Sequence, residues 1–297
     1  KQLLKTHYGL SLKEIMSISQ GAGGESWIAF CEEGKYIVKF PGQSEMDHPE
    51  AEPALCQYLL SRNIPSCRFV PNRQGDFFTR TENGKLMQVK HFEEGTVYPF
   101  HQAPPWLIPQ AAQMLGRIHH ALRTYQGLSE GIGERFFRYM TPERALRSHR
   151  ATLAIALERK DLPAAEDLQF RIRLLENTKP YLPPLSRLTC LPTHGDYGIN
   201  QLVCGKDHIH CVIDWTSACI HPVAWEIIRS FVYADPSCRD GRLSPDALKA
   251  YTAAYMEYSP LTSDDLAHMV PLFYYQSLVC DFYGQYYASS SPNRSLF

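Results

Sequence analysis

Short apolar runs alternate with turn residues over the first third of the chain. The segment "SWIAFCEEGKYIVKF" predicts two strands joined by a turn at residues 33–35, and "DFFTRTENGKLMQVKHF" predicts two more joined at residues 83–84. Between these hairpins, "HPEAEPALCQYLLSRNIP" carries apolar residues at helical spacing from Ala54 to Leu60. We therefore expect residues 1–91 to form a small antiparallel sheet with one helix packed on it.

The remainder of the chain has mainly the apolar period of helices. "PPWLIPQAAQMLGRIHHALRTY" opens with proline, and "SPDALKAYTAAYMEY" and "SDDLAHMVPLFYYQSLVCDFYGQYY" open with Ser or Asp at the position of an N-cap. Only "NQLVC" and "IHCVIDW" interrupt this pattern with runs typical of strands. Residues 135–173 are rich in Arg with acids interleaved, which indicates a solvated helix face. We expect residues 92–297 to form a larger, mainly helical unit.

Composition excludes several classes of protein. The 297 residues are 44% hydrophobic, which is enough for a substantial core. The formal net charge of −1 gives no basic excess, so we expect no nucleic-acid partner. The first residues lack the apolar core of a signal peptide, and no run is long enough to span a bilayer, so we expect no membrane association and a cytoplasmic location.

Cysteine and histidine give little indication of a metal centre. The nine Cys residues are scattered through apolar surroundings without zinc-type spacing, which favours buried free thiols. His208 and His210 share one face of a possible strand and could ligate a metal, but they lie where a hairpin turn is expected. We consider a metal role for this pair the weaker interpretation.

The stretch "LPTHGDYGINQLVCGKDHIHCVIDWTSA" carries the most specific chemistry. Phosphoryl transfer uses one carboxylate at the acceptor and further oxygen ligands on magnesium. Asp196 and Asp214 suit these two roles, because the predicted hairpin between them would bring them together in space. His194 has no local acidic or nucleophilic partner, so we expect it to pack and hold the turn rather than react.

The first third supplies groups suited to phosphate. "SQGAGGESW" places Gly21, Gly23, Gly24 and Ser26 around the start of a strand, where a bare backbone could approach phosphates, although an ordinary loop has the same signature. "YIVKF" embeds Lys39 in an apolar strand, where its ammonium must reach water or pair with an anion.

Two acids at the start of the predicted helix could pair with Lys39. Glu52 and Glu50 are both candidates, and a solvated helix start is the alternative for each.

Taken together, "HGDYGINQ", "VIDW", "YIVKF" and "LGRIHHAL" resemble the aminoglycoside phosphotransferase and choline kinase superfamily, whose fold is similar to that of protein kinases. The resemblance covers nearly the whole chain and implies a two-lobed α+β fold, with an N-lobe at residues 1–91 and a C-lobe at residues 92–297. It implies that Asp196 is the catalytic base, that Asp214 binds magnesium and that Lys39 binds phosphate.

The same resemblance assigns three further positions. Glu52 is preferred to Glu50 as the partner of Lys39, because its distance from the "IP" dipeptide matches the family. "QVKHFEEG" corresponds to the hinge between the lobes, with backbone groups near His91 and Glu93 facing the adenine.

Two positions depart from the family pattern. The family's Asn ligand follows the catalytic Asp with four residues between, and that count reaches Gln201 rather than Asn200. A Gln amide oxygen still suits magnesium. Glu226 stands where the family more often has an Asp that braces the catalytic loop, which leaves that role open.

We therefore expect a magnesium-dependent small-molecule kinase. It would transfer the γ-phosphate of ATP or GTP to a hydroxyl of a small metabolite or antibiotic, with magnesium held by Gln201 and Asp214. The first alternative is a catalytically idle relative that serves as a binding or scaffold protein, and retention of Lys39, Asp196 and Asp214 argues against it. The second is a metal-dependent hydrolase, which would need more His ligands near the motif.

The acceptor and the oligomeric state are not specified by these patterns. "LFYYQSLVCDFYGQYY" offers aromatic residues and Asp281 that could suit a cationic acceptor. Aromatic residues at this spacing more often form a helix core, so we predict no choline site.

Overall fold

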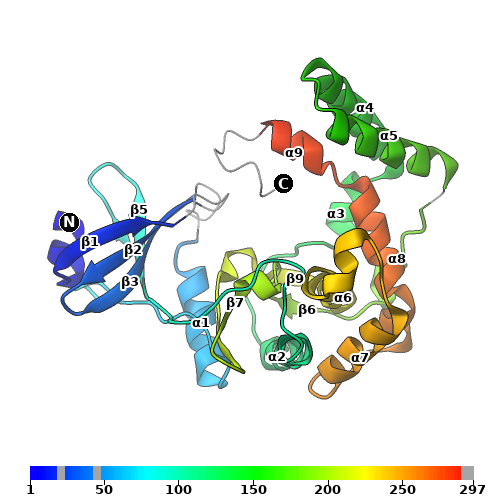
Figure 1. Cartoon of the computed structure of the whole chain (residues 1–297). Helices are drawn as coiled ribbons and strands as arrows, with labels where there is room; N and C mark the ends of the chain where they lie inside the picture. The colour runs from blue at the N-terminus through cyan, green and yellow to red at the C-terminus, as the bar shows by residue number, and fades with distance from the viewer. Residues whose placement is uncertain (19–23, 43–47, 179, 289–297) are drawn as a thin grey trace.

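The N-terminal sheet has five antiparallel strands. The computed structural model describes residues 1–18, 24–42, 48–178 and 180–288 (Figure 1). The strand order is β1-β2-β3-β5-β4, and the bounds are β1 Leu12–Ser17, β2 Gly24–Cys31, β3 Gly34–Pro41, β4 Thr79–Arg80 and β5 Leu86–His91. This small sheet and the larger helical part confirm the predicted two-lobed α+β fold.

The sheet differs from the prediction at its start. The β2–β3 hairpin turns at Glu32 and Glu33, one residue before the predicted turn. Strand β1 was not predicted, because the first residues have apolar positions at helical spacing, and that spacing yields only one helical turn at Leu4–Tyr8. Strand β1 lies at the edge of the sheet and buries only Leu12, so its sequence carries no alternating pattern.

The two faces of the sheet are chemically different. Lys39 lies opposite Gln88 and Ile37 lies opposite Lys90, and because these positions alternate along β3 and β5, all four side chains share one face. The other face is an apolar cluster that the N-terminal turn covers, and it contains Leu4, Leu10, Leu12, Ala29, Cys31, Tyr36, Val38, Met87 and Val89. The sheet therefore presents two lysines on the face away from its own core.

Helix α1 (Ala51–Ser61) packs differently from the prediction. It was expected to pack on the sheet, but its buried residues Leu55, Cys56 and Leu59 belong to the core of the larger lobe. Figure 1 shows α1 beside α2, and its first turn reaches the sheet, where Glu52 contacts Lys90. The physical reason is the apolar surface that is available for burial. The apolar side of the sheet is already covered, whereas α2 (Leu107–Leu122) has a long apolar face on which α1 can pack.

The larger lobe contains helices and two short strand pairs. Strands β6 (Cys190–Thr193) and β9 (Cys219–Pro222) pair, as do β7 (Leu202–Cys204) and β8 (Ile209–Val212); the first pair was not predicted. The other helices are α3 Glu134–Tyr139, α4 Pro142–Glu158, α5 Leu162–Asn177, α6 Val223–Ala234, α7 Pro245–Met256, α8 Ser263–Val279 and α9 Phe282–Ala288. No helix in the part of the chain that the structure describes is long and apolar enough to cross a membrane.

Candidate functional site

The loops that carry Asp196 and Asp214 are in direct contact. Ile213, which precedes Asp214, donates its N–H to the Gln201 carbonyl at 2.9 Å, and its own carbonyl lies 2.9 Å from His194 Nε2. Gly195 has φ +81°, and a Cβ there would lie 1.8 Å from the Ser217 carbonyl oxygen, so the approach of the two loops requires glycine.

His194 has the structural role that we expected. Its side chain is fully buried and packs against the rings of Tyr197 and Trp215. Its Nδ1 lies 3.3 Å from the backbone N of Asp196 and its Nε2 lies against Ile213. The imidazole therefore links the two loops instead of facing solvent.

Both carboxylate oxygens of Asp196 have donors. Gln201 Nε2 donates to Oδ2 at 3.2 Å, and Arg229 donates to Oδ1 from α6. The Asp196 side chain keeps 38% of its surface exposed. Arg229 was not predicted from the sequence; the only signal is the i, i+4, i+8 spacing of Trp225, Arg229 and Tyr233, which places the three on one face of a helix.

Glu226 reaches the same loop from α6. Its Oε1 accepts the backbone N–H of Gly195 at 2.6 Å, and its Oε2 lies 2.8 Å from Nε2 of His119 on α2. Nδ1 of His119 in turn lies 2.8 Å from the hydroxyl of Tyr255. Burial acts to raise the pKa of Glu226, but the hydrogen bond and charge of His119 outweigh it and lower the pKa to about 2. Glu226 therefore makes the bracing contact that we left open.

Asp214 lies at a strained point of the backbone. Its φ is +61°, which is uncommon outside glycine and often marks a functional position. Its carboxylate is 48% exposed, accepts the Thr216 hydroxyl at 2.9 Å and lies 3.8 Å from Lys39 Nζ. The structure thus brings the ammonium of the sheet to the carboxylate of the larger lobe.

Glu52 contacts a lysine that was not predicted as its partner. Its Oε1 accepts from Lys90 Nζ at 2.6 Å, and the backbone N–H of Trp215 points to the same oxygen at 3.3 Å. Burial alone lowers the pKa of Lys90, but the carboxylate of Glu52 outweighs burial and raises it. The sheet face carries two lysines, and α1 brings Glu52 to Lys90; the Lys39–Glu52 pair stays a prediction.

The rival candidate Glu50 lies outside this contact. It occupies the N-cap position of α1 and is exposed, with its Oε1 3.7 Å from Nδ1 of the exposed His48. This is the solvated helix start that we considered as the alternative.

Only part of the predicted glycine loop can be located. Gly21 and Gly23 lie outside the described residues. Gly24 begins β2 with φ +115°, and a Cβ there would lie 2.2 Å from the Phe40 carbonyl oxygen. Ser26 pairs directly with Lys39 in the β2–β3 ladder, so this strand start lies beside the lysine.

Hydrogen bonds to neighbouring residues fix the predicted hinge at His91 and Glu93. The backbone N–H of His91 already donates to the Arg68 carbonyl at 2.8 Å, so it is not available to an adenine in this arrangement. The Glu93 carboxylate accepts from Arg68 Nε at 3.0 Å and lies 3.2 Å from His210 Nε2. The N–H of His91 is thus engaged, and a hinge role for the other backbone groups near His91 and Glu93 stays a prediction.

Two further sequence features have structural explanations. His210 faces Glu93, and no cluster of three or more His, Cys, Asp or Glu side chains placed for a metal occurs among the described residues. Asp281 caps α9 by accepting the N–H of Gly284 at 2.8 Å, and it also accepts the hydroxyls of Ser148 and Thr152. It is thereby committed to joining α9 to α4.

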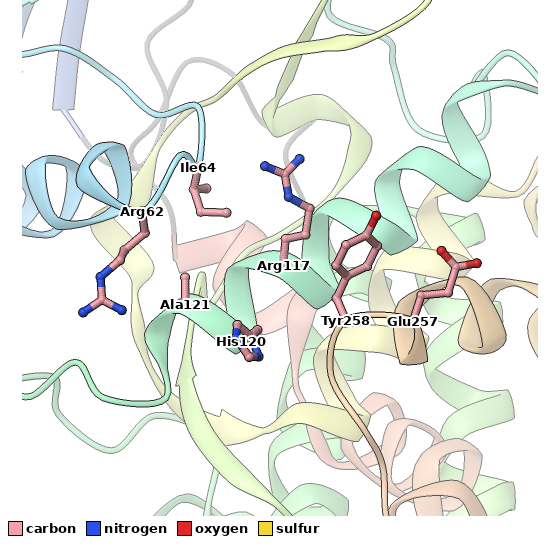
Figure 2. A pocket seen from close by; sticks show the side chains of 7 residues that line it. All are labelled: Arg62, Ile64, Arg117, His120, Ala121, Glu257 and Tyr258. Carbon is pink, nitrogen blue, oxygen red and sulfur yellow. The ribbon is translucent and has the colours of Figure 1, made fainter.

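A surface cavity of about 510 Å³ lies away from these groups. It is formed at the end of α1, on α2 and after α7, and Figure 2 shows the side chains that line it: Arg62, Ile64, Arg117, His120, Ala121, Glu257 and Tyr258. None of the predicted catalytic, nucleotide-binding or metal-binding residues lines it. Arg117 is engaged there with the Asn63 carbonyl at 2.9 Å, which ties the end of α1 to α2.

Comparison with known proteins gives a family and a fold. The model of the phosphotransferase enzyme family matches residues 14–261. A search of curated proteins finds no match.

Solved structures with low identity share the fold. A spectinomycin phosphotransferase, solved with ADP and spectinomycin, is 16% identical with a TM-score of 0.64 over 99% of this chain and 88% of that one. An aminoglycoside phosphotransferase from Alicyclobacillus acidocaldarius is 14% identical with a TM-score of 0.65 over 99% and 89%. A microcompartment-associated aminopropanol kinase is 14% identical with a TM-score of 0.63 over 99% and 90%.

Proposed function

The chain belongs to the phosphotransferase enzyme family, and we propose that it transfers the terminal phosphoryl group of ATP or GTP, with magnesium, to a hydroxyl group of a small molecule. As a family member it is a small-molecule phosphotransferase. Neighbours of the same fold were solved with ADP or AMP-PNP, which supports a nucleotide as the phosphoryl donor.

One observation carries the proposal: Lys39 Nζ lies 3.8 Å from Asp214 Oδ1 at the junction of the two lobes. A phosphate chain bound there would meet the ammonium from the sheet side and the carboxylate from the other side. Strand β3 buries Lys39, and a buried ammonium needs negative charge beside it, part of which Asp214 provides. A bound triphosphate would add further negative charge beside this ammonium.

The residues present fit a magnesium ion. Hard oxygen donors are what magnesium prefers, and Asp214 offers a half-exposed carboxylate while Gln201 offers an amide oxygen on the adjoining loop. With Gln201 Nε2 turned to Asp196, its Oε1 is left for a cation. When bound, the ion would neutralise charge on the phosphate oxygens.

Asp196 is the group suited to the acceptor. Its carboxylate is exposed enough to meet a hydroxyl, and α6 fixes the loop that carries it through Glu226 and Gly195. The carboxylate would orient the hydroxyl and accept its proton as the oxygen bonds to phosphorus, while the nucleoside diphosphate leaves. The other protein groups of the site would position the nucleotide and the acceptor, and such positioning is a large part of the catalysis of phosphoryl transfer.

Thermal unfolding with nucleotide tests the proposal. A ligand that binds only the folded state at a hundredfold over its dissociation constant adds about 2.7 kcal/mol to the free energy of unfolding. We expect ATP or GTP with magnesium to raise the melting temperature, and Lys39→Met to remove most of that rise. The matched control is Lys35→Met, which changes an exposed lysine of the same strand that pairs with Glu94. Absence of any nucleotide effect would favour the idle scaffold.

A further inference from the structure

Arg229 and Asp196 form one unit on the acceptor side of the proposed site. The guanidinium donates to Asp196 Oδ1 and, through its other terminal nitrogen, to the Tyr197 carbonyl at 3.1 Å. The Arg229 side chain is 16% exposed, so little of its charge is left to solvent. Charge-assisted contacts of this kind are among the strong hydrogen bonds of proteins.

A column of flat groups holds the guanidinium in place. Its Cζ lies 5.7 Å from the ring centroid of Trp225 and 4.9 Å from that of Tyr233, the residues one helical turn to either side on α6. Trp225 stacks on His221 at 4.7 Å, and Tyr233 stacks on Phe100 at 4.6 Å. An arginine placed between two aromatic faces loses the freedom to swing away from the carboxylate.

Phe100 brings this column to the loop of Asp196. Its ring lies 3.5 Å from the position that a Cβ of Gly198 would occupy. The backbone N–H of His101 donates to the Tyr233 carbonyl at 2.8 Å and His101 has φ +61°, so the segment is pinned to the end of α6. Phe100 nevertheless keeps 39% of its surface exposed, which leaves an apolar face beside the loop.

From this geometry we infer that Arg229 is a positioning and specificity-determining residue, which makes the acceptor position neutral in charge and selects acceptors with no ammonium group beside the reacting hydroxyl. The inference rests on the proposed function. An uncovered Asp196 carboxylate would attract amines, but here its charge is compensated by Arg229, and an incoming ammonium would meet the guanidinium at close range. The favoured acceptor class is an uncharged or anionic hydroxyl compound, whose apolar face rests on Phe100.

A pair of ring compounds tests the inference without turnover. 2-Deoxystreptamine is a hydroxylated cyclic diamine, and myo-inositol is an uncharged ring of similar size. By NMR titration at low salt, we expect the diamine to bind the wild-type protein no tighter than myo-inositol. In Arg229→Gln the diamine should bind about fivefold to tenfold tighter while myo-inositol is unchanged, a range that reflects a partly exposed ion pair.

The control removes an arginine from another aspartate. Arg187 donates to both carboxylate oxygens of Asp264, at 3.1 and 2.6 Å, so Arg187→Gln also uncovers an Asp, but one on α8 that has no role in the proposed site. Diamine affinity should not change in Arg187→Gln. A merely structural role for Arg229 predicts no gain of diamine binding in either variant.

A second variant tests the inference even if Arg229→Gln does not fold. Asp196→Asn keeps the aromatic column and uncovers the guanidinium, so sulfate should bind about fivefold tighter than in the wild-type protein. The inference is overturned if the wild-type protein binds the diamine tightly through Asp196, if uncovering either group leaves ion binding unchanged, or if an amine beside the hydroxyl marks the best acceptor. Nucleotide stabilisation is independent of all these results, so failure of the proposed function would be recognised separately.

Discussion

At the residue scale, the proposed assignment separates two aspartates that are close in sequence. Asp196 is proposed to meet the acceptor and is paired with Arg229, whereas Asp214 is proposed to hold magnesium and lies 3.8 Å from Lys39. We expect Asp196→Asn to leave the nucleotide-induced rise in melting temperature unchanged, while reducing transfer to a screened acceptor by roughly a hundredfold to ten-thousandfold, the effect of a lost general base. Asp214→Asn should instead remove the magnesium-dependent part of that rise. Full turnover in Asp196→Asn would refute the role.

The amides at positions 200 and 201 compete for one metal. Gln201 is nearly buried and already contacts Asp196, whereas Asn200 lies at the turn with its Oδ1 close to Gly198. We expect Gln201→Ala to raise the magnesium concentration for half-maximal activity about tenfold or more. Gln201→Asn should keep part of the activity, and Asn200→Ala should change the requirement little. The reverse pattern in magnesium titrations would transfer the ligand role to Asn200.

Sequence reasoning located residues that act through local spacing and missed those that act across the fold. Asp196 and Asp214 were recognised because a hairpin between them is visible in the pattern. The partner of Glu52 could not be derived, because two lysines share one sheet face and only the docking of α1 decides between them. Arg229 was missed for the same reason: a helical Arg between aromatic residues resembles any solvated position until the facing loop is known.

At the element scale, α6 holds the loop of Asp196 with a buried carboxylate. The pKa of Glu226 is lowered from its ordinary 4.5 to about 2, so the folded state is stabilised by its ionised form. This contribution is fully present above pH 4.5 and is lost as the pH falls toward 2; the shift corresponds to roughly 3 kcal/mol.

Glu226→Gln tests this contribution. We expect the wild-type protein to lose about 2 kcal/mol more unfolding free energy than Glu226→Gln between pH 7 and pH 3, measured by urea unfolding. Ser244→Ala, which removes a helix cap on α7, serves as a control that lowers stability without changing its pH dependence. If the unfolding free energies of Glu226→Gln and the wild-type protein changed with pH to the same extent, the ionised form of Glu226 would contribute no stability.

The presence of a helix or strand was easier to predict from the sequence than the way in which it packs. The β2–β3 and β7–β8 hairpins and helices α1, α2 and α7 follow from period and caps. The β6–β9 pair escaped because its four-residue strands carry prolines and short apolar runs without alternation. The expected long C-terminal helix is two helices, because Asp281 caps a new one instead of continuing the old.

At the scale of the whole molecule, α1 joins the lobes thermodynamically. Leu59 is fully buried on α1 yet packs in the core of the larger lobe. Leu59→Ala should cost about 2–5 kcal/mol of unfolding free energy. The cavity that Leu59→Ala would create lies in the core to which α1, α2 and α6 all contribute. The main thermal transition should therefore shift as one unit, with equal calorimetric and van't Hoff enthalpies. Separate melting of a fragment that includes α1 would contradict this view.

The packing of α1 also determines where spectroscopic labels should be attached to observe motion between the lobes. Cys190 carries an exposed thiol on the larger lobe, and Leu60 is an exposed position on α1. A label pair at Cys190 and a Leu60→Cys variant should keep a constant distance when nucleotide is added, since both ends belong to one packed body. A pair at Cys190 and a Lys13→Cys variant on β1 should report any displacement of the sheet. A label on α1 is therefore expected to follow the larger lobe, although α1 lies before residue 91 in the sequence.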